Sequence, residues 1–185
     1  MNQVEIAQFH LYRKSYFLRC MMTAELSCHL LVSPFTKSAV MFNPSRDQAR
    51  RLFFDTWQKY HRKEPLSGME TVVLEVILQH PEYHSMLQDV ERYLDKDFPP
   101  ELGETNPFLH MSMHVAIREQ LAIDQPAGIL QRFEQLKTRL QGDEHEAMHH
   151  VMECLAEMLW HSQRNQTAPD AEIYLECMDK RIGNK

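Results

Sequence analysis

The chain is poor in glycine, with five residues among 185, and it contains no run of about 18 consecutive apolar residues. Few glycines beside many Leu, Met, Glu and Gln residues favour helices over a turn-rich sheet protein, and the missing apolar run excludes a membrane-spanning helix. A hydrophobic content of 43% is enough to fill the core of one domain. We therefore predict an all-α protein, an up-and-down bundle of four to five helices with a short C-terminal helix.

Dense groups of lysine and arginine are also absent, and the formal net charge is −6. A nucleic-acid-binding protein needs clustered cations to neutralise phosphates, and binding to an anionic membrane surface has the same requirement. We therefore predict neither nucleic acid nor a membrane as a partner. The sequence indicates no other partner, and it is compatible with an assembly of identical copies.

The cysteines form neither a CxxC motif nor a dense framework; they are Cys20, Cys28, Cys154 and Cys177. This usage is typical of reduced thiols in a cytoplasmic protein, which is our prediction for this chain. A helical wheel places Cys154 and His150 together on the polar side of their helix. Catalysis by a Cys–His pair has little support there, because no third member of such a group is present.

Helix start signals recur along the chain from residue 41 onward. Capping-box spacing occurs at Ser45 and Gln48, at Ser67 and Glu70, and at Asp143 and Glu146, and a cap followed by proline occurs at Asn106 and Pro107. These signals predict helices over residues 45–62, 67–80, 106–123 and 124–141. A further helix is expected to open at residue 143, and a short one after residue 169.

Residues 1–40 precede the first of these signals. We predict that they are an N-terminal extension, either a mis-assigned gene start or a disordered segment, and that the fold does not need them. Residues 41–185 are predicted to form a single helical-bundle domain. Within it, residues 89–106 contain several charges, two prolines and a glycine, so we expect a linker with one short helical turn.

Pairs of histidines four residues apart are the most informative feature of the chain: His80 and His84, His110 and His114, His145 and His149. This spacing puts two side chains on one face of a helix, and neutral imidazole is the commonest protein ligand for a transition metal. Because Pro81 interrupts its helix, the first pair is expected to straddle a corner. Alternating helix directions then bring the three pairs to the same end of the bundle.

The predicted metal ligands are these six histidines and Glu144, which projects towards the apolar side of its helix. They suit a mononuclear histidine site or a di-iron centre, and zinc, iron, nickel and manganese are the candidate metals. No nucleotide or organic cofactor is indicated. The alternative is a non-enzymatic helical adaptor or regulatory module whose histidines form a hydrogen-bonded network without metal. No GxSxG, HExxH or glycine-rich phosphate loop assigns a reaction.

Four stretches carry a family resemblance: MFNPSRDQARRLFFDTW from Met41, HPEYH from His80, TNPFLHMSMHVAIREQLAIDQP from Thr105, and the segment from Asp143 to Trp160. Through them the chain, from Met41 to about Met178, resembles a bacterial family of uncharacterised proteins catalogued as domain of unknown function 1841. Members of that family typically begin at the position equivalent to Met41. The resemblance implies no activity, so it assigns no catalytic residue to this chain.

Overall fold

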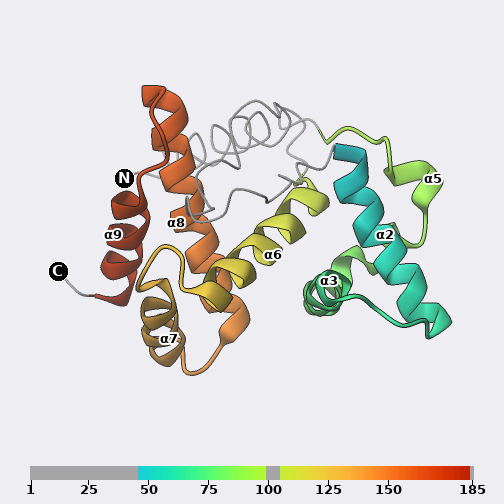
Figure 1. Cartoon of the computed structure of the whole chain (residues 1–185), viewed down its shortest axis with the longest axis horizontal. Coiled ribbons are helices and arrows are strands. Elements are labelled where there is room, and N and C mark those ends of the chain that lie inside the picture. The colour runs from blue at the N-terminus through green and yellow to red at the C-terminus, as the bar shows by residue number, and fades with distance from the viewer. Residues whose placement is uncertain (1–45, 99–104, 184–185) are drawn as a thin grey trace, which may run out of the picture. The chain divides into compact units, whose positions relative to one another are not determined.

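The computed structural model describes residues 46–98 and 105–183, and every regular secondary-structure element in those residues is a helix. The elements are α2 (Arg46–Arg62), α3 (Gly68–Gln79), the 3-10 turn η2 (Pro81–Tyr83), α4 (His84–Leu87), α5 (Val90–Tyr93), α6 (Pro107–Ile123), α7 (Ile129–Arg139), α8 (Glu144–Asn165) and α9 (Ala171–Ile182) (Figure 1). The predicted all-α class is therefore confirmed. The predicted N-terminal extension and the Ser45 cap lie outside the described residues.

The described chain divides into two compact units, and the boundary between Val115 and Ala116 falls inside α6. We call residues 46–98 and 105–115 the N-terminal unit, and residues 116–183 the C-terminal unit. Among the helices of these described segments, none has the length and apolar character needed to cross a membrane.

The core of the N-terminal unit is aromatic on one side and aliphatic on the other. Phe53, Phe54 and Trp57 come from α2, and Val76 and Ile77 come from α3; all are at most 4% exposed. This arrangement follows from the sequence, because both helices repeat apolar residues at intervals of three and four. Burying these side chains is the main contribution to the stability of this unit.

Arg50 is an unusual member of this core, since its side chain belongs to a type that is seldom fully buried. Only 3% of it is exposed, and its guanidinium donates hydrogen bonds to the carbonyl oxygens of Leu94 and Lys96 at 2.6 and 2.8 Å. The guanidinium also lies over the Phe108 ring, 4.9 Å from its centroid. Burial lowers the pKa of Arg50. Arg50 thereby attaches the chain after α5 to helix α2.

A capping box begins α3, as the sequence predicts. The backbone N–H of Ser67 donates to Glu70 Oε2 at 2.7 Å, and Lys59 Nζ of α2 donates to Glu70 Oε1 at 2.6 Å. The hydrogen bond from Lys59 and the one from the Ser67 backbone lower the pKa of Glu70 to about 2. Glu70 therefore both caps α3 and joins it to α2.

Replacing Glu70 by glutamine is expected to destabilise the protein by about 0.5–1 kcal/mol at pH 7, since the charge at the helix start and the ion pair are lost. The folded-state pKa of Glu70 is depressed, so its contribution is complete above the unfolded value of 4.5 and is lost as the pH falls towards 2. Urea unfolding of the wild type and of Glu70→Gln should therefore give free energies of unfolding whose difference narrows as the pH falls from 5 to 3. In the Glu70→Gln background, a further Lys59→Gln change should have little effect; a full additional loss would contradict the pairing.

In the C-terminal unit, α7, α8 and α9 lie side by side (Figure 1). Asp143 caps α8, because its Oδ1 accepts a hydrogen bond from the Glu146 backbone at 2.9 Å. Tyr174 of α9 is 1% exposed, and its hydroxyl donates to Gln120 Oε1 at 3.0 Å. Each of the three helices also buries apolar side chains, for example Phe133 of α7, Val151 of α8 and Met178 of α9.

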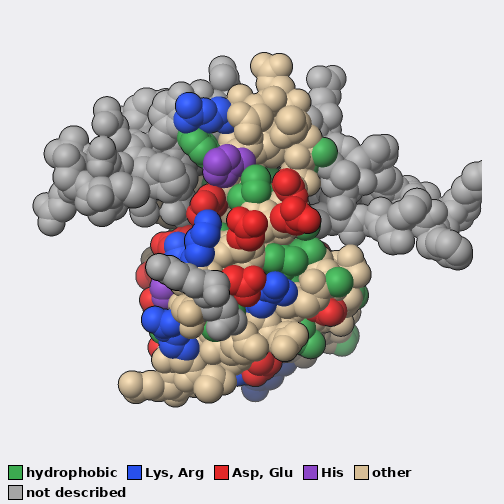
Figure 2. All heavy atoms as spheres, turned by 90° about the vertical axis from the view of Figure 1, so that its left-hand side faces the viewer, with side chains coloured by type: hydrophobic (Ala, Val, Ile, Leu, Met, Phe, Trp, Pro, Cys, Tyr) green, Lys and Arg blue, Asp and Glu red, His purple; other side chains and the backbone are tan. Residues whose placement is uncertain are grey.

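Ion pairs join α9 to both of its neighbours. Arg132 Nε of α7 is 2.9 Å from Asp179 Oδ1, and Arg181 Nη2 is 2.7 Å from Glu153 Oε2 of α8. Figure 2 shows acidic and basic side chains interspersed on this side of the molecule. Such partly exposed pairs add little stability individually, but they define which helix faces meet.

The expectation of reduced thiols is wrong for two of the four cysteines. Cys154 of α8 and Cys177 of α9 form a disulfide, 23 positions apart in sequence, and both are buried. The placement of Cys154 on a polar face also differs from the structure. A wheel treats α8 as having one buried side, whereas α7 and α9 both pack against it and α9 covers the side of Cys154.

Helix α7 begins later than predicted, at Ile129 instead of near Asp124. Asp124 has a positive φ of 49°, and its Oδ1 accepts hydrogen bonds from the backbones of Gly128 and Leu130, both at 3.0 Å. These bonds lower the pKa of the Asp124 carboxyl. An aspartate that accepts hydrogen bonds from the following backbone in this way forms a turn. Helix α7 therefore begins only after Gly128, which is its N-cap.

Candidate metal centre

His80 lies at the corner that the sequence predicts. Helix α3 ends at Gln79, His80 takes φ −124° and ψ 65°, and Pro81 opens the 3-10 turn. The residue before a proline avoids helical angles, so the chain changes direction at His80. The side chain of His80 is 1% exposed, and it therefore points into the protein.

His84 begins α4, on the other side of this corner. Its Nε2–H donates to the carbonyl oxygen of Ile77 at 2.9 Å. The His84 ring also lies 4.4 Å from the Trp57 ring, at an interplanar angle of 34°. These contacts place His84 against the aromatic core, and it does not belong to the group of four histidines described below.

Helix α6 positions His110 and His114. Asn106 begins the helix by accepting hydrogen bonds from the backbones of Phe108 and Leu109, at 3.1 and 3.2 Å. One turn separates the two histidines, and their Nε2 atoms are 3.2 Å apart. His114 is fully buried, whereas His110 is half-buried.

The imidazole rings of these α6 residues meet His80 within the N-terminal unit. The centroid of the His80 ring is 4.7 Å from that of His110 and 4.6 Å from that of His114. Three imidazoles that come from two parts of one unit therefore share a buried site. Tyr83 stacks on His80, with ring centroids 5.6 Å apart, and burial raises the pKa of its hydroxyl.

Glu82 supplies a carboxylate at the edge of this cluster. Its Oε1 is 2.9 Å from His80 Nδ1. Burial is the largest single influence on the pKa of Glu82 and raises it, but the hydrogen bond with His80, a backbone hydrogen bond and the interactions with the nearby His80 and His110 together lower the pKa. Glu82 is not among the predicted ligands, although its place two residues after His80 in a proline turn was an available signal.

The remaining predicted ligands lie at the start of α8. His145 and His149 are one turn apart, with ring centroids separated by 4.4 Å, and both are half-buried. Glu144 is exposed, and its Oε1 is 3.7 Å from Arg118 Nη2. The neighbouring His150 takes a different partner, because its Nδ1 accepts a hydrogen bond from Arg181 at 2.6 Å.

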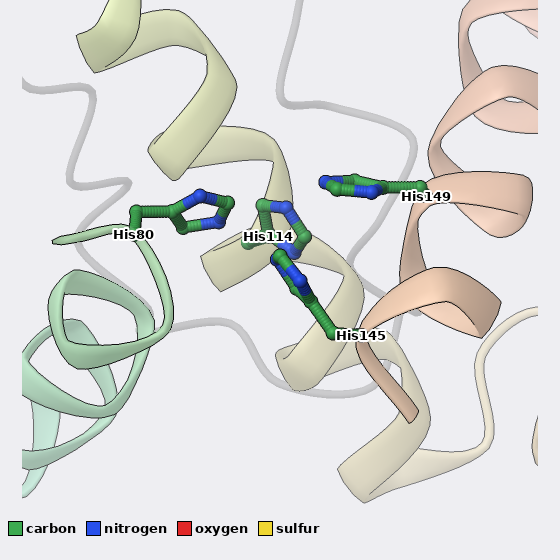
Figure 3. A group of neighbouring side chains, drawn as sticks. All are labelled: His80, His114, His145 and His149. Carbon is green, nitrogen blue, oxygen red and sulfur yellow. The ribbon is translucent and has the colours of Figure 1, made fainter. Parts of the chain in front are cut away.

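Figure 3 labels four histidines of the types that hold a metal ion: His80 and His114 of the N-terminal unit, and His145 and His149 of the C-terminal unit. The four belong to the seven predicted ligands. Of the other three, His110 adjoins His80 and His114, while His84 and Glu144 have the partners described above. The group contains nitrogen donors alone, which suits a borderline transition metal.

A family model with the description Domain of unknown function (DUF1841) matches residues 45–180. No curated protein and no solved structure matches the chain. The matched range contains α2 to α8 and most of α9, together with every histidine considered above. The chain therefore belongs to the DUF1841 family.

Proposed function

We propose that this protein binds one transition-metal ion through imidazole nitrogens, with four ligands: His80, His114, His145 and His149. The observation that carries the proposal is the cluster of His80, His110 and His114 in the N-terminal unit, whose ring centroids lie 4.6–4.9 Å apart. His145 and His149 form a second such pair in the C-terminal unit, with centroids 4.4 Å apart. Two nitrogens bound to one tetrahedral zinc ion are about 3.3 Å apart, because zinc–nitrogen bonds are about 2.0–2.1 Å long.

The chemistry of the donors favours a single ion over a pair. Di-iron and di-manganese centres in helical bundles need several carboxylates, which bridge and neutralise the two metals. The proposed ligands include none, and Glu144 lies beside Arg118. Four neutral imidazoles suit Zn²⁺, Ni²⁺ or another divalent ion of similar softness, whereas Mg²⁺ and Ca²⁺ prefer oxygen.

His110 has a supporting role in this proposal. Its Nε2 faces Nε2 of His114 at 3.2 Å, so in the metal-free protein one of the two nitrogens carries a proton and donates a hydrogen bond to the other. Binding of a metal at His114 Nε2 competes with that hydrogen bond. The same pair would satisfy its own polar atoms in an adaptor without metal, which is the alternative function.

The metal content of the untagged protein tests the proposal. After reconstitution with Zn²⁺ and gel filtration, we expect about one equivalent per chain by elemental analysis, and a chelator should lower the melting temperature reversibly. At a free Zn²⁺ concentration a hundred times the Kd, the stabilisation is about 2.7 kcal/mol. Less than about a tenth of an equivalent after reconstitution, also with Ni²⁺, Mn²⁺ and Fe²⁺, would favour the adaptor.

A further inference from the structure

Glu82 is a surface carboxylate that reaches a buried imidazole. Its side chain is 55% exposed, whereas the side chain of His80 is 1% exposed, and Glu82 Oε1 is 2.9 Å from His80 Nδ1. Exposed carboxylates have water as a ready alternative partner. The short contact between Glu82 and the buried His80 ring therefore bears on the tautomer and the orientation of that ring.

The backbone of the corner holds this contact in place. Pro81 opens the 3-10 turn directly after His80, and the Tyr83 backbone N–H donates to the His80 carbonyl at 3.0 Å. The turn brings the side chain of Glu82 back beside His80, two residues earlier. Tyr83 stacks on a face of the His80 ring, at an interplanar angle of 24°.

The contact determines which nitrogen of His80 carries the proton. An ionised carboxylate only accepts hydrogen bonds, so Nδ1 must be the donor, and the lone pair of the neutral ring is on Nε2. Nε2 is separated from Nδ1 by one ring carbon and lies at the end of the ring farther from the backbone. Figure 3 shows the His80 ring directed at His114, and their centroids are 4.6 Å apart. His80 is thus presented with its metal-binding nitrogen towards His114.

We propose that Glu82 is a positioning residue of the metal centre, which fixes the tautomer and orientation of His80 so that Nε2 binds the ion. This inference rests on the proposed function. A carboxylate that accepts the second N–H of a ligating histidine also makes that ligand more basic, and its loss typically costs about 10–100-fold in metal affinity. The contact between His149 Nδ1 and Glu146 Oε2 is 3.9 Å, beyond hydrogen-bond distance, so Glu146 is a weaker candidate for this role.

Zinc affinity of Glu82 variants gives the first test, by competition with a chromophoric chelator. We expect Glu82→Ala to weaken Zn²⁺ binding about 10–100-fold, and Glu82→Gln, which retains an uncharged acceptor, to weaken it less. Glu91→Ala, an exposed carboxylate on α5, is the matched control and should bind as the wild type does. Equal affinities for all four proteins would overturn the role of Glu82.

The state of the His80 ring in metal-free protein gives the second test, which does not depend on bound metal. Nitrogen-15 NMR should find the Nδ1–H tautomer of His80 in the wild type and a mixture of tautomers in Glu82→Ala. The same tautomer in both proteins would contradict the proposal. If the wild type binds no metal while the tautomer does shift, the proposed function fails and only the hydrogen bond survives.

Discussion

Replacing His114 by alanine is expected to weaken Zn²⁺ binding by more than about a hundredfold, because partners outside the coordination shell alone contribute about 10–100-fold. His114 is fully buried, and its ring lies against both His80 and His110. Its loss removes one donor from the proposed site, and no water can replace it without entering the core. Competition with a chelator of known affinity measures the change.

The same substitution should also remove the effect of metal on stability. Zn²⁺ that binds only the folded protein raises the melting temperature of the wild type, whereas the His114→Ala protein should melt at one temperature with and without the ion. His161→Ala is the control, because this histidine of α8 packs beside Trp160 and is not among the proposed ligands.

The His114→Leu substitution distinguishes the two proposed functions, because they predict opposite changes in the melting temperature. If the buried imidazole is a ligand, His114→Leu loses metal and the stability that metal provides. If it is only a buried polar group, an apolar side chain of similar volume is neutral or stabilising. A leucine variant that melts at a higher temperature with unchanged metal content would remove His114 from the proposed site.

Loss of the Cys154–Cys177 disulfide is expected to destabilise the C-terminal unit by about 3 kcal/mol. The estimate follows from the entropy of the unfolded chain, since a cross-link between residues 23 positions apart closes a loop for which such a value is typical. Because α8 and α9 are held by this bond, their contact should weaken most. Urea unfolding with and without a reductant, followed by circular dichroism, measures the loss as a lower midpoint.

Two variants check that the effect belongs to this disulfide. A Cys154→Ala/Cys177→Ala protein should be less stable and insensitive to reductant, whereas a Cys20→Ala/Cys28→Ala protein should remain sensitive. Mass spectrometry of an unreduced digest should find the Cys154 and Cys177 peptides linked. Separate peptides, each with a free thiol, would contradict the cross-link.

Most helix starts were predictable because the interactions that determine them are local. Asn106 accepts hydrogen bonds from residues two and three positions later, and Asp143 does so from Glu146. Ser67 and Glu70 are equally close in sequence. A capping residue and its partner thus lie within one turn, and the one-dimensional pattern already contains both.

Predictions from the sequence were wrong where one residue type is compatible with two local structures, or where a helix distant in sequence packs against the predicted surface. Asp124 is of a residue type that commonly caps helices, yet its carboxylate stabilises a turn that continues to Gly128. Cys154 was placed on a polar face because a wheel contains no information about α9, which begins 17 residues after it and covers that face. Packing partners of this kind are set by the tertiary structure.

The sequence by itself determined the residue types and the helical class of this protein: an all-α chain that carries imidazoles in pairs one turn apart. Spacing along a helix relates only the two members of a pair, and it is the same for all three pairs. Tertiary structure decided that His80 approaches His114 while His84 packs against Trp57, and that Glu82 accepts a hydrogen bond from His80 Nδ1. Those choices depend on the corner at Pro81 and on residues some 30 positions apart, whose contact arises only when the hydrophobic core forms.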